Sequence, residues 1–135
     1  MLALTAKGIR KWFGASLAVD GIDFSIAGQE RLVILGRRGA GKSTLLRLLA
    51  GLETPDQGTL LVDGQEVTRP PPHTRGLALV SQYYALYPQL TVQQNLETAL
   101  APLALDRVER QRRVADALAW FDIESLSSRL PAELS

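Results

Sequence analysis

The residues with the clearest capacity for chemistry form one short run of glycines, followed by a lysine and two hydroxyl residues. The run is Gly36-Arg37-Arg38-Gly39-Ala40-Gly41-Lys42-Ser43-Thr44. An apolar stretch over 31–35 precedes it, and a leucine-rich stretch over 45–49 follows it. This order predicts a strand, a glycine-rich loop and a helix, which is the context in which the pattern G-x-x-x-x-G-K-[ST] binds phosphate.

Each residue type in this run suits a triphosphate. The glycines lack a Cβ, so the backbone can bend and approach phosphate oxygens closely. The N–H groups of the loop and the positive end of the helix would then form an anion site. Lys42 would bring a mobile charge to the β- and γ-phosphates, the Ser43 hydroxyl would bind Mg²⁺, and Thr44 would donate to the α-phosphate.

The other loop residues carry less information. Arg37 and Arg38 could add positive charge near the phosphates, although two solvated arginines are the simpler interpretation, and Ala40 completes the loop. A glycine-rich turn that binds nothing is the alternative interpretation of the whole run. The adjacent lysine and serine argue against it, because neither contributes to packing at the start of a helix. We therefore interpret 36–44 as a phosphate-binding loop.

Composition excludes several classes of function. The chain has 135 residues, of which 46% are hydrophobic and 21% charged, so it can form a globular core. The net charge of +1 provides no field that would attract nucleic acid. Cysteine is absent, which excludes disulfides, cysteine-bound zinc and a thiol nucleophile. No stretch has the length of a membrane span, and the start does not read as a secretory signal, so a cytoplasmic location is expected.

Hydrophobic patterning predicts the elements that position the loop. Strands are expected over 2–6, 22–26, 31–35, 59–62, 65–67 and 77–81. The first is expected at a sheet edge, whereas 31–35 and 77–81 are apolar throughout and are expected as buried parallel strands. Asp63-Gly64 predicts a hairpin turn, and Gly51 is expected to end a helix over 42–50.

Two further helices are expected beyond residue 90. The capping-box pairs are Thr91 with Gln94 for a helix over 92–101, and Asp106 with Glu109 for a helix over 107–121. The expected apolar positions of the second helix are Val108, Ala115, Leu118 and Ala119. The chain is thus predicted as an α/β protein, with a β-rich part and loop over 1–90 and a helical part over 91–135.

Gln82 is the second candidate site residue, because it follows the predicted buried strand over 77–81. Ligands bind α/β sheets at the carboxyl ends of their strands. The amide of Gln82 can offer its oxygen to Mg²⁺ and its N–H₂ group to a water or a phosphate. The alternative is a loop glutamine that is hydrogen-bonded to the backbone.

Together, the loop over 36–44, the segment around Gln82 and the ending Leu130-Pro131-Ala132-Glu133-Leu134-Ser135 resemble the ATP-binding subunits of ABC transporters. The stretch 84–92 is most similar to the branch that serves importers of sugars and polyamines. The resemblance covers the chain from Leu4 to Ser135. It implies a P-loop NTPase core with an N-terminal antiparallel β subdomain and the beginning of a helical subdomain, and hence an incomplete domain.

The resemblance also implies roles for individual residues. Phe13 matches the aromatic residue that stacks on adenine, and Ala18 lies where that region approaches the ribose. Gln82 matches the glutamine that senses the γ-phosphate and Mg²⁺, so Lys42 and Gln82 would act in catalysis. The segment Gln82–Pro88 would face a transmembrane permease. The alternatives are a core position for Phe13 or Trp12, and burial of Tyr84 and Tyr87 beneath the helical subdomain.

Several parts of the family pattern do not occur in this sequence. Leu134-Ser135 matches only the opening of the signature Leu-Ser-Gly-Gly-Gln, and no Walker B strand with its catalytic glutamate, D-loop or switch histidine follows. The stretches 17–20 and 60–63 imitate Walker B but are followed by glycine, and His73 lies in a proline-rich loop. We therefore expect this chain alone to hydrolyse no ATP.

The resemblance implies that a complete subunit would bind ATP and Mg²⁺ and form a head-to-tail dimer with a second ATP-binding subunit. Its ATPase activity would drive solute import through permease subunits that hold it at the inner face of the membrane. Two alternatives remain for this chain. It could be a non-hydrolytic nucleotide-binding fragment, or a truncated product without a role.

Overall fold

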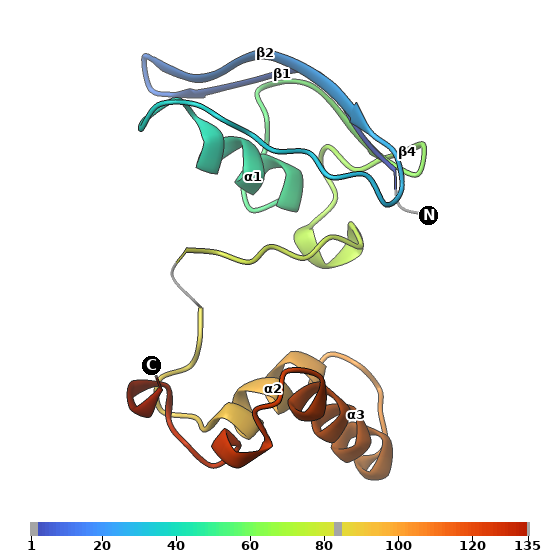
Figure 1. Ribbon diagram of the computed structural model, residues 1–135. Helices are drawn as coiled ribbons and strands as arrows, with labels where there is room; N and C mark the ends of the chain where they lie inside the picture. Colours follow the sequence, from blue (N-terminus) through green and yellow to red (C-terminus); the bar gives the residue numbers. More distant parts are fainter. Residues whose placement is uncertain (1–2, 83–84, 135) are drawn as a thin grey trace. The chain divides into compact units, whose positions relative to one another are not determined.

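The computed structural model describes residues 3–82 and 85–134 (Figure 1). The chain divides into two compact units, Met1–Val80 and Ser81–Ser135, which we describe separately. This boundary after residue 80 differs from the predicted division into 1–90 and 91–135. Among the described residues, no helix has the length and apolar character needed to cross a membrane.

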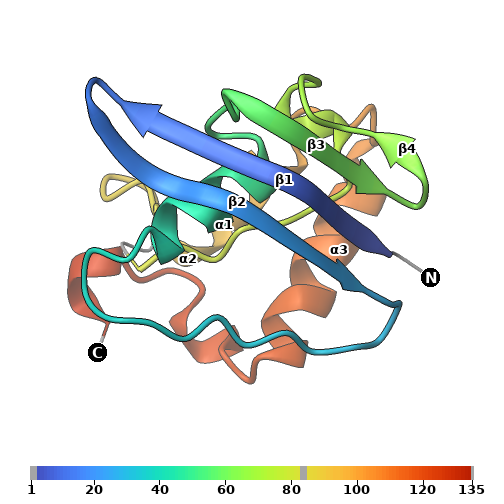
Figure 2. The ribbon, with the colours of Figure 1, turned by 90° about the horizontal axis from the view of Figure 1, so that it is seen from above.

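The first unit is built on an antiparallel sheet. Its strands are β1 (Leu4–Phe13), β2 (Ser16–Ile26), β3 (Gln57–Val62) and β4 (Gln65–Glu66). Their order is β2-β1-β3-β4, which Figure 2 shows from above. The prediction of an N-terminal edge strand is therefore wrong, because β1 pairs with β2 on one side and with β3 on the other. One-sided burial gives the same alternation in a central and an edge strand, so the pattern could not distinguish them.

The turn between β3 and β4 confirms the predicted hairpin. Asp63 and Gly64 have φ angles of +49° and +78°, as a two-residue hairpin turn requires. The Asp63 carboxylate accepts a hydrogen bond from the backbone N–H of Ala3 at 2.6 Å. The acid that imitates Walker B therefore has a local structural role.

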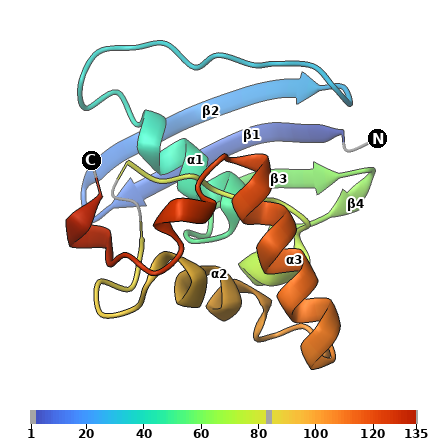
Figure 3. The ribbon, with the colours of Figure 1, turned by 60° about the horizontal axis from the view of Figure 1, so that its bottom comes forward.

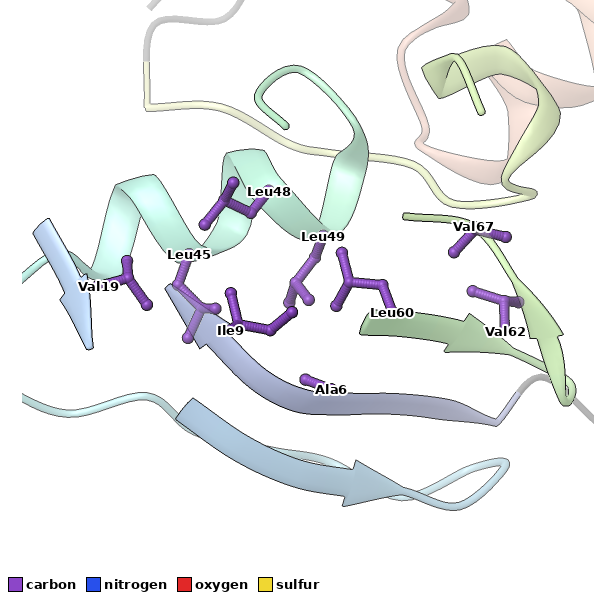
Figure 4. Close-up of a cluster of buried hydrophobic side chains, with 9 residues drawn as sticks. All are labelled: Ala6, Ile9, Val19, Leu45, Leu48, Leu49, Leu60, Val62 and Val67. Atoms are coloured by element: carbon purple, nitrogen blue, oxygen red, sulfur yellow. The ribbon is translucent and has the colours of Figure 1, made fainter. Parts of the chain in front are cut away.

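One helix, α1 (Lys42–Ala50), covers a face of this sheet. Leu45, Leu48 and Leu49 of the helix pack with Ile9 and Leu60 in a single apolar cluster (Figure 4). Ile9, Leu48 and Leu60 have the largest fully buried side chains among the described residues.

The predicted C-terminal glycine of α1 is also confirmed. Gly51 has φ +81°, and its N–H bonds to backbone carbonyls in the last turn of the helix. A short 3₁₀ helix, Pro72–Thr74, follows within the segment that the sequence analysis predicted as a proline-rich loop.

The predicted strands over 31–35 and 77–81 do not form. Both segments lack strand hydrogen bonding, and Figures 2 and 3 show the first as part of a coil outside β2. Val33, Leu35 and Val80 are 73%, 87% and 94% exposed. A strand depends on a partner for its hydrogen bonds, and no described strand pairs with either segment. An apolar run alone therefore could not decide whether these segments form strands.

The second unit contains α2 (Val92–Leu100) and α3 (Arg107–Trp120), with short 3₁₀ helices at Glu124–Leu126 and Pro131–Glu133 (Figure 3). The capping box of α2 is confirmed. The Thr91 hydroxyl accepts from the N–H of Gln94, and the Gln94 amide oxygen accepts from the N–H of Thr91 at 2.9 Å. These reciprocal bonds fix the start of the helix.

Only half of the corresponding box forms at α3. Asp106 accepts from the N–H of Glu109 at 2.8 Å, whereas the Glu109 carboxylate accepts from Arg112 and Arg113 at 2.9 and 2.7 Å. Hydrogen bonds from Arg112 and then Arg113 lower the pKa of Glu109 to about 2. The guanidinium groups therefore compete successfully for this carboxylate.

The predicted apolar face of α3 is largely wrong. Val114 and Leu118 are its buried residues, whereas Val108, Ala115 and Ala119 are exposed. Val114 and Leu118 are four positions apart and therefore lie on one face. Alanines contributed two of the four predicted positions, and such small side chains do not define a face.

Candidate phosphate-binding site

The loop over 36–41 enters α1 through a backbone shape that glycine permits. Gly39 and Gly41 have φ angles of +82° and +81°, and Gly41 is the N-cap of α1 without a side-chain cap. A Cβ at Gly41 would collide with the carbonyl oxygen of Ala18. The helix thus begins against the backbone of β2, and no side chain caps its first-turn N–H groups. Such groups at a helix N-terminus favour an anionic ligand.

Lys42 lies folded over the loop that precedes it. Its ammonium group donates to the carbonyl oxygens of Gly36 at 2.8 Å and Arg37 at 2.7 Å. These bonds join the two limbs of the loop and place a positive charge beside its first two residues. An ammonium group has three N–H donors, so one remains beyond these two bonds for a further acceptor.

A cavity of about 480 Å³ adjoins the loop within the first unit. Ala18 from β2 and Ala40, Gly41 and Lys42 line it, so the structure brings these predicted residues together. Ser43 is exposed and Thr44 half-buried in the first turn of α1, and Arg37 and Arg38 are exposed on the loop. The cavity is wide enough for several atoms of a ligand beside the loop.

Other residues that the sequence motifs did not indicate also line this cavity. They are Leu17, Val19, Asp20, Ile22, Ile34, Leu35 and Leu45. Asp20 is the charged residue among them, and its carboxylate accepts from Arg10 at 3.0 Å. The period-two alternation of β2 around Ala18 is the signal that could have found Asp20 and Ile22.

Phe13 ends β1 and is 48% exposed, so its side chain is not in the core. The ammonium group of Lys11 lies 5.5 Å from the centroid of its ring. An aromatic ring held at a strand end and open to solvent can stack on a planar ligand.

Gln82 belongs to the second unit and is exposed. Its predicted role beside the phosphate-binding loop therefore stays a prediction. Tyr83 and Tyr84 lie outside the described residues. Tyr87 is 50% exposed, and its backbone exchanges hydrogen bonds with the Asn95 side chain at 2.8 and 3.1 Å. These bonds tie the end of the segment 82–88 to α2.

The second unit also contains an apolar cavity of about 590 Å³. Its lining includes Leu86, Tyr87, Leu96, Ala99 and Ile123. No cluster of three or more acidic or histidine residues that could hold a metal ion occurs in the described part of either unit.

Comparison with known proteins gives a consistent result. The family model described as ABC transporter matches residues 19–135. The sn-glycerol-3-phosphate import ATP-binding protein UgpC 1 of Rhizobium johnstonii is 41% identical over 135 residues, which are 100% of this chain and 37% of that protein. The chain spans about two fifths of the length of the curated relatives that it matches.

Solved structures give the same fold. A nucleotide-free ATP-binding cassette from an ABC transporter has a TM-score of 0.84 and 24% identity, covering 100% of this chain and 60% of the other. A dimeric, post-hydrolysis structure of the ATP-binding cassette MJ0796 with ADP and Pi has a TM-score of 0.77 and 25% identity, covering 98% and 63%. These likenesses confirm the predicted fold class.

Proposed function

Because this chain belongs to the ABC transporter family, we propose that it binds the phosphates of ATP through residues 36–44. The observation that carries the proposal is the loop geometry, in which left-handed glycines at Gly39 and Gly41 lead into an uncapped helix. The ammonium group of Lys42 lies over that loop. Backbone N–H groups and one mobile cation are the donor set that a polyphosphate requires.

Different residues of the loop would contact different phosphates. The Lys42 ammonium would bond the β- and γ-phosphates, and Thr44 would donate to the α-phosphate. Arg37 and Arg38 are exposed and would contribute long-range charge. Phe13 would stack on the base, and Ala18 would lie near the ribose.

Magnesium would enter with the nucleotide. Mg²⁺ keeps several waters and commonly binds one or two protein oxygens together with substrate phosphates. The exposed hydroxyl of Ser43, in the first turn of α1, fits that limited demand without an acidic cluster. Gln82 would supply a second oxygen. The bound ion would neutralise the phosphate charge.

In a complete subunit, we propose that ATP binding and hydrolysis energise solute import. The curated relative in Rhizobium johnstonii is named as an import ATP-binding protein, and the MJ0796 cassette is dimeric. The partners would be permease subunits and a second ATP-binding subunit, arranged head to tail. The permease would hold the subunit at the cytoplasmic face of the membrane. The small net charge gives no reason to add a nucleic acid.

The segment Gln82–Pro88 would contact the permease. It ends at the apolar cavity of the second unit, to which Leu86 and Tyr87 contribute. Both side chains are about half exposed. A groove lined by aliphatic and aromatic side chains suits the apolar face of a partner helix.

Residues 1–135 alone should bind nucleotide without turning it over. Lys42 and Gln82 can position phosphates and metal, whereas the sequence supplies neither a Walker B carboxylate nor the glutamate that would polarise water. Positioning and charge stabilisation without activation of the water should leave hydrolysis negligible. ATP turnover by this chain that disappears in Lys42→Ala would refute this part of the proposal.

The binding proposal is tested with a fluorescent ATP analogue and Mg²⁺, titrated into the chain. Lys42→Ala should raise the Kd about tenfold to a hundredfold, because a charge-assisted hydrogen bond contributes about 1.5–3 kcal/mol. Lys7→Ala is the matched control, since Lys7 is an exposed lysine on β1. Equal Kd values for Lys42→Ala and the parent chain would overturn the proposal.

A further inference from the structure

Lys11 has an unusually fixed ammonium group near the end of β1. It donates to the carbonyl oxygen of Thr54 at 2.8 Å and lies 3.5 Å from the Asp56 carboxylate. The same group lies 5.5 Å from the centroid of the Phe13 ring. The Lys11 side chain is only 14% exposed. A lysine on a surface strand usually extends into water, so three neighbours around one ammonium group require a reason.

Asp56 connects this cluster to the strand backbone. Its carboxylate accepts from the N–H of Trp12 at 2.7 Å, and its own N–H donates to the carbonyl of Arg10 at 2.9 Å. The bond from Trp12, and then the charge of Lys11, lower the pKa of Asp56 below its ordinary value. The carboxylate therefore stays ionised at neutral pH. The two hydrogen bonds of Asp56 hold the backbone of β1 at Arg10 and Trp12, just before Phe13.

Phe13 itself is partly open to solvent. It is 48% exposed, and the turn after it begins at Gly14 with φ +58°. The cation of Lys11 lies over the ring, so one face has a neighbour of fixed position. Cations prefer the negative face of an aromatic ring, and this attraction limits the tilt of the ring. A planar ligand that stacks on the ring would therefore have to use the opposite face.

We propose that Lys11 is a positioning residue that orients the Phe13 ring for stacking on the base of a bound nucleotide. This inference rests on the proposed function, because it assigns a base to the nucleotide held at residues 36–44. The role of Lys11 concerns the selectivity for a base, whereas the proposed function concerns the binding of the phosphates. The Lys11–Asp56 cluster should favour a polyphosphate that carries a base over one that does not, without changing the phosphate contacts.

The experiment compares Kd values for Mg-ATP and for magnesium tripolyphosphate, which has no base. Phe13→Ala should weaken ATP binding about fivefold or more and leave tripolyphosphate unchanged, as loss of a base–aromatic stack predicts. Lys11→Gln should weaken ATP binding about twofold to fivefold, again with tripolyphosphate unchanged. Lys11→Arg should restore the preference, because a guanidinium group can also lie over a ring and pair with Asp56. Lys7→Gln on the same strand is the control.

The ratio of the two Kd values separates this inference from the proposed function. If Lys42→Ala leaves tripolyphosphate binding unchanged, the phosphate-binding proposal fails. If that binding depends on Lys42 but Lys11→Gln leaves the ratio unaltered, or weakens both ligands equally, the positioning role is wrong. Should Lys11→Gln fail to fold, Asp56→Asn retains an acceptor for Trp12 and must shift the ratio in the same direction. An unchanged ratio in that variant would also overturn the inference.

Discussion

Replacement of Arg75 by methionine should destabilise the first unit strongly. Arg75 is 3% exposed, and burial lowers the pKa of its guanidinium group, which nevertheless stays charged. It donates to the backbone carbonyls of Leu48, Leu49, Thr68 and Pro70 at 2.8, 3.2, 3.1 and 3.0 Å. Two of these acceptors are in the last turn of α1, and two are in the chain before the 3₁₀ helix Pro72–Thr74. One side chain therefore joins the helix that follows the phosphate-binding loop to a distant segment.

The size of the effect follows from the carbonyls that would lose their donor. A hydrogen bond to a charged group contributes about 1.5–3 kcal/mol, and a buried unsatisfied polar group costs about 1–3 kcal/mol. The four bonds do not add, since Leu48 still accepts from the N–H of Gly51 at 3.2 Å and removal of the buried charge offsets part of the loss. A net loss of about 3–5 kcal/mol is therefore expected, which is a large share of the stability of an ordinary domain.

Urea unfolding followed by tryptophan fluorescence measures this loss in the first unit. Trp12 is half-buried in β1, whereas Trp120 of the second unit is 86% exposed and should change its emission little. Arg75→Lys should lose less stability than Arg75→Met, because lysine keeps the positive charge. It should still lose some stability, because an ammonium group cannot reach all four carbonyls. Arg69→Met, at an exposed position, is the control and should change stability by less than about 0.5 kcal/mol. A change for Arg75→Met as small as that of the control would refute the reasoning.

Two further predictions concern the loop and α3. Gly41→Ala should abolish most nucleotide binding, because the added Cβ would collide with the carbonyl oxygen of Ala18. Gly39→Ala should weaken binding less, because Gly39 also has a left-handed φ but its Cβ would meet no atom within 4 Å. Equal Kd values for the two variants would contradict this prediction. The contribution of Glu109 to α3 should be present above its ordinary pKa of 4.5 and decline as the pH falls toward about 2, because its folded pKa is lowered. Circular dichroism should record this loss of helix, and Glu109→Gln should remove that part of the pH dependence.

The sequence predicted those features that short-range backbone chemistry decides. The hairpin at Asp63-Gly64, the capping box of Thr91 and Gln94, and the glycine at the end of α1 each depend on residues within a few positions of one another. The start of α1 directly after the glycine-rich loop belongs to the same group. Such features can be read from residue type, because no distant partner is needed to complete them.

Features that depend on distant partners could not be predicted in this way. The stretch 31–35 has the composition of a buried strand, yet no described strand pairs with it, and Val33 and Leu35 are exposed. The Lys11–Asp56 cluster could not be predicted for a similar reason, since its members are 45 positions apart in the sequence. Ion pairs between a strand end and a later loop leave no periodic signal.

The phosphate-binding loop is held by both local and distant contacts. Its upstream limb follows a segment without strand hydrogen bonds. The bonds from Lys42 to Gly36 and Arg37 hold that limb, and Ile34 before it packs against the apolar core. Its downstream limb continues into α1, which the apolar core secures along one face and Arg75 secures at the far end. The loop is therefore anchored on both sides. The Lys42 ammonium group has one N–H donor beyond its two loop bonds. Bonding to both the β- and γ-phosphates would therefore require it to release one loop carbonyl, which would couple the shape of the upstream limb to the ligand.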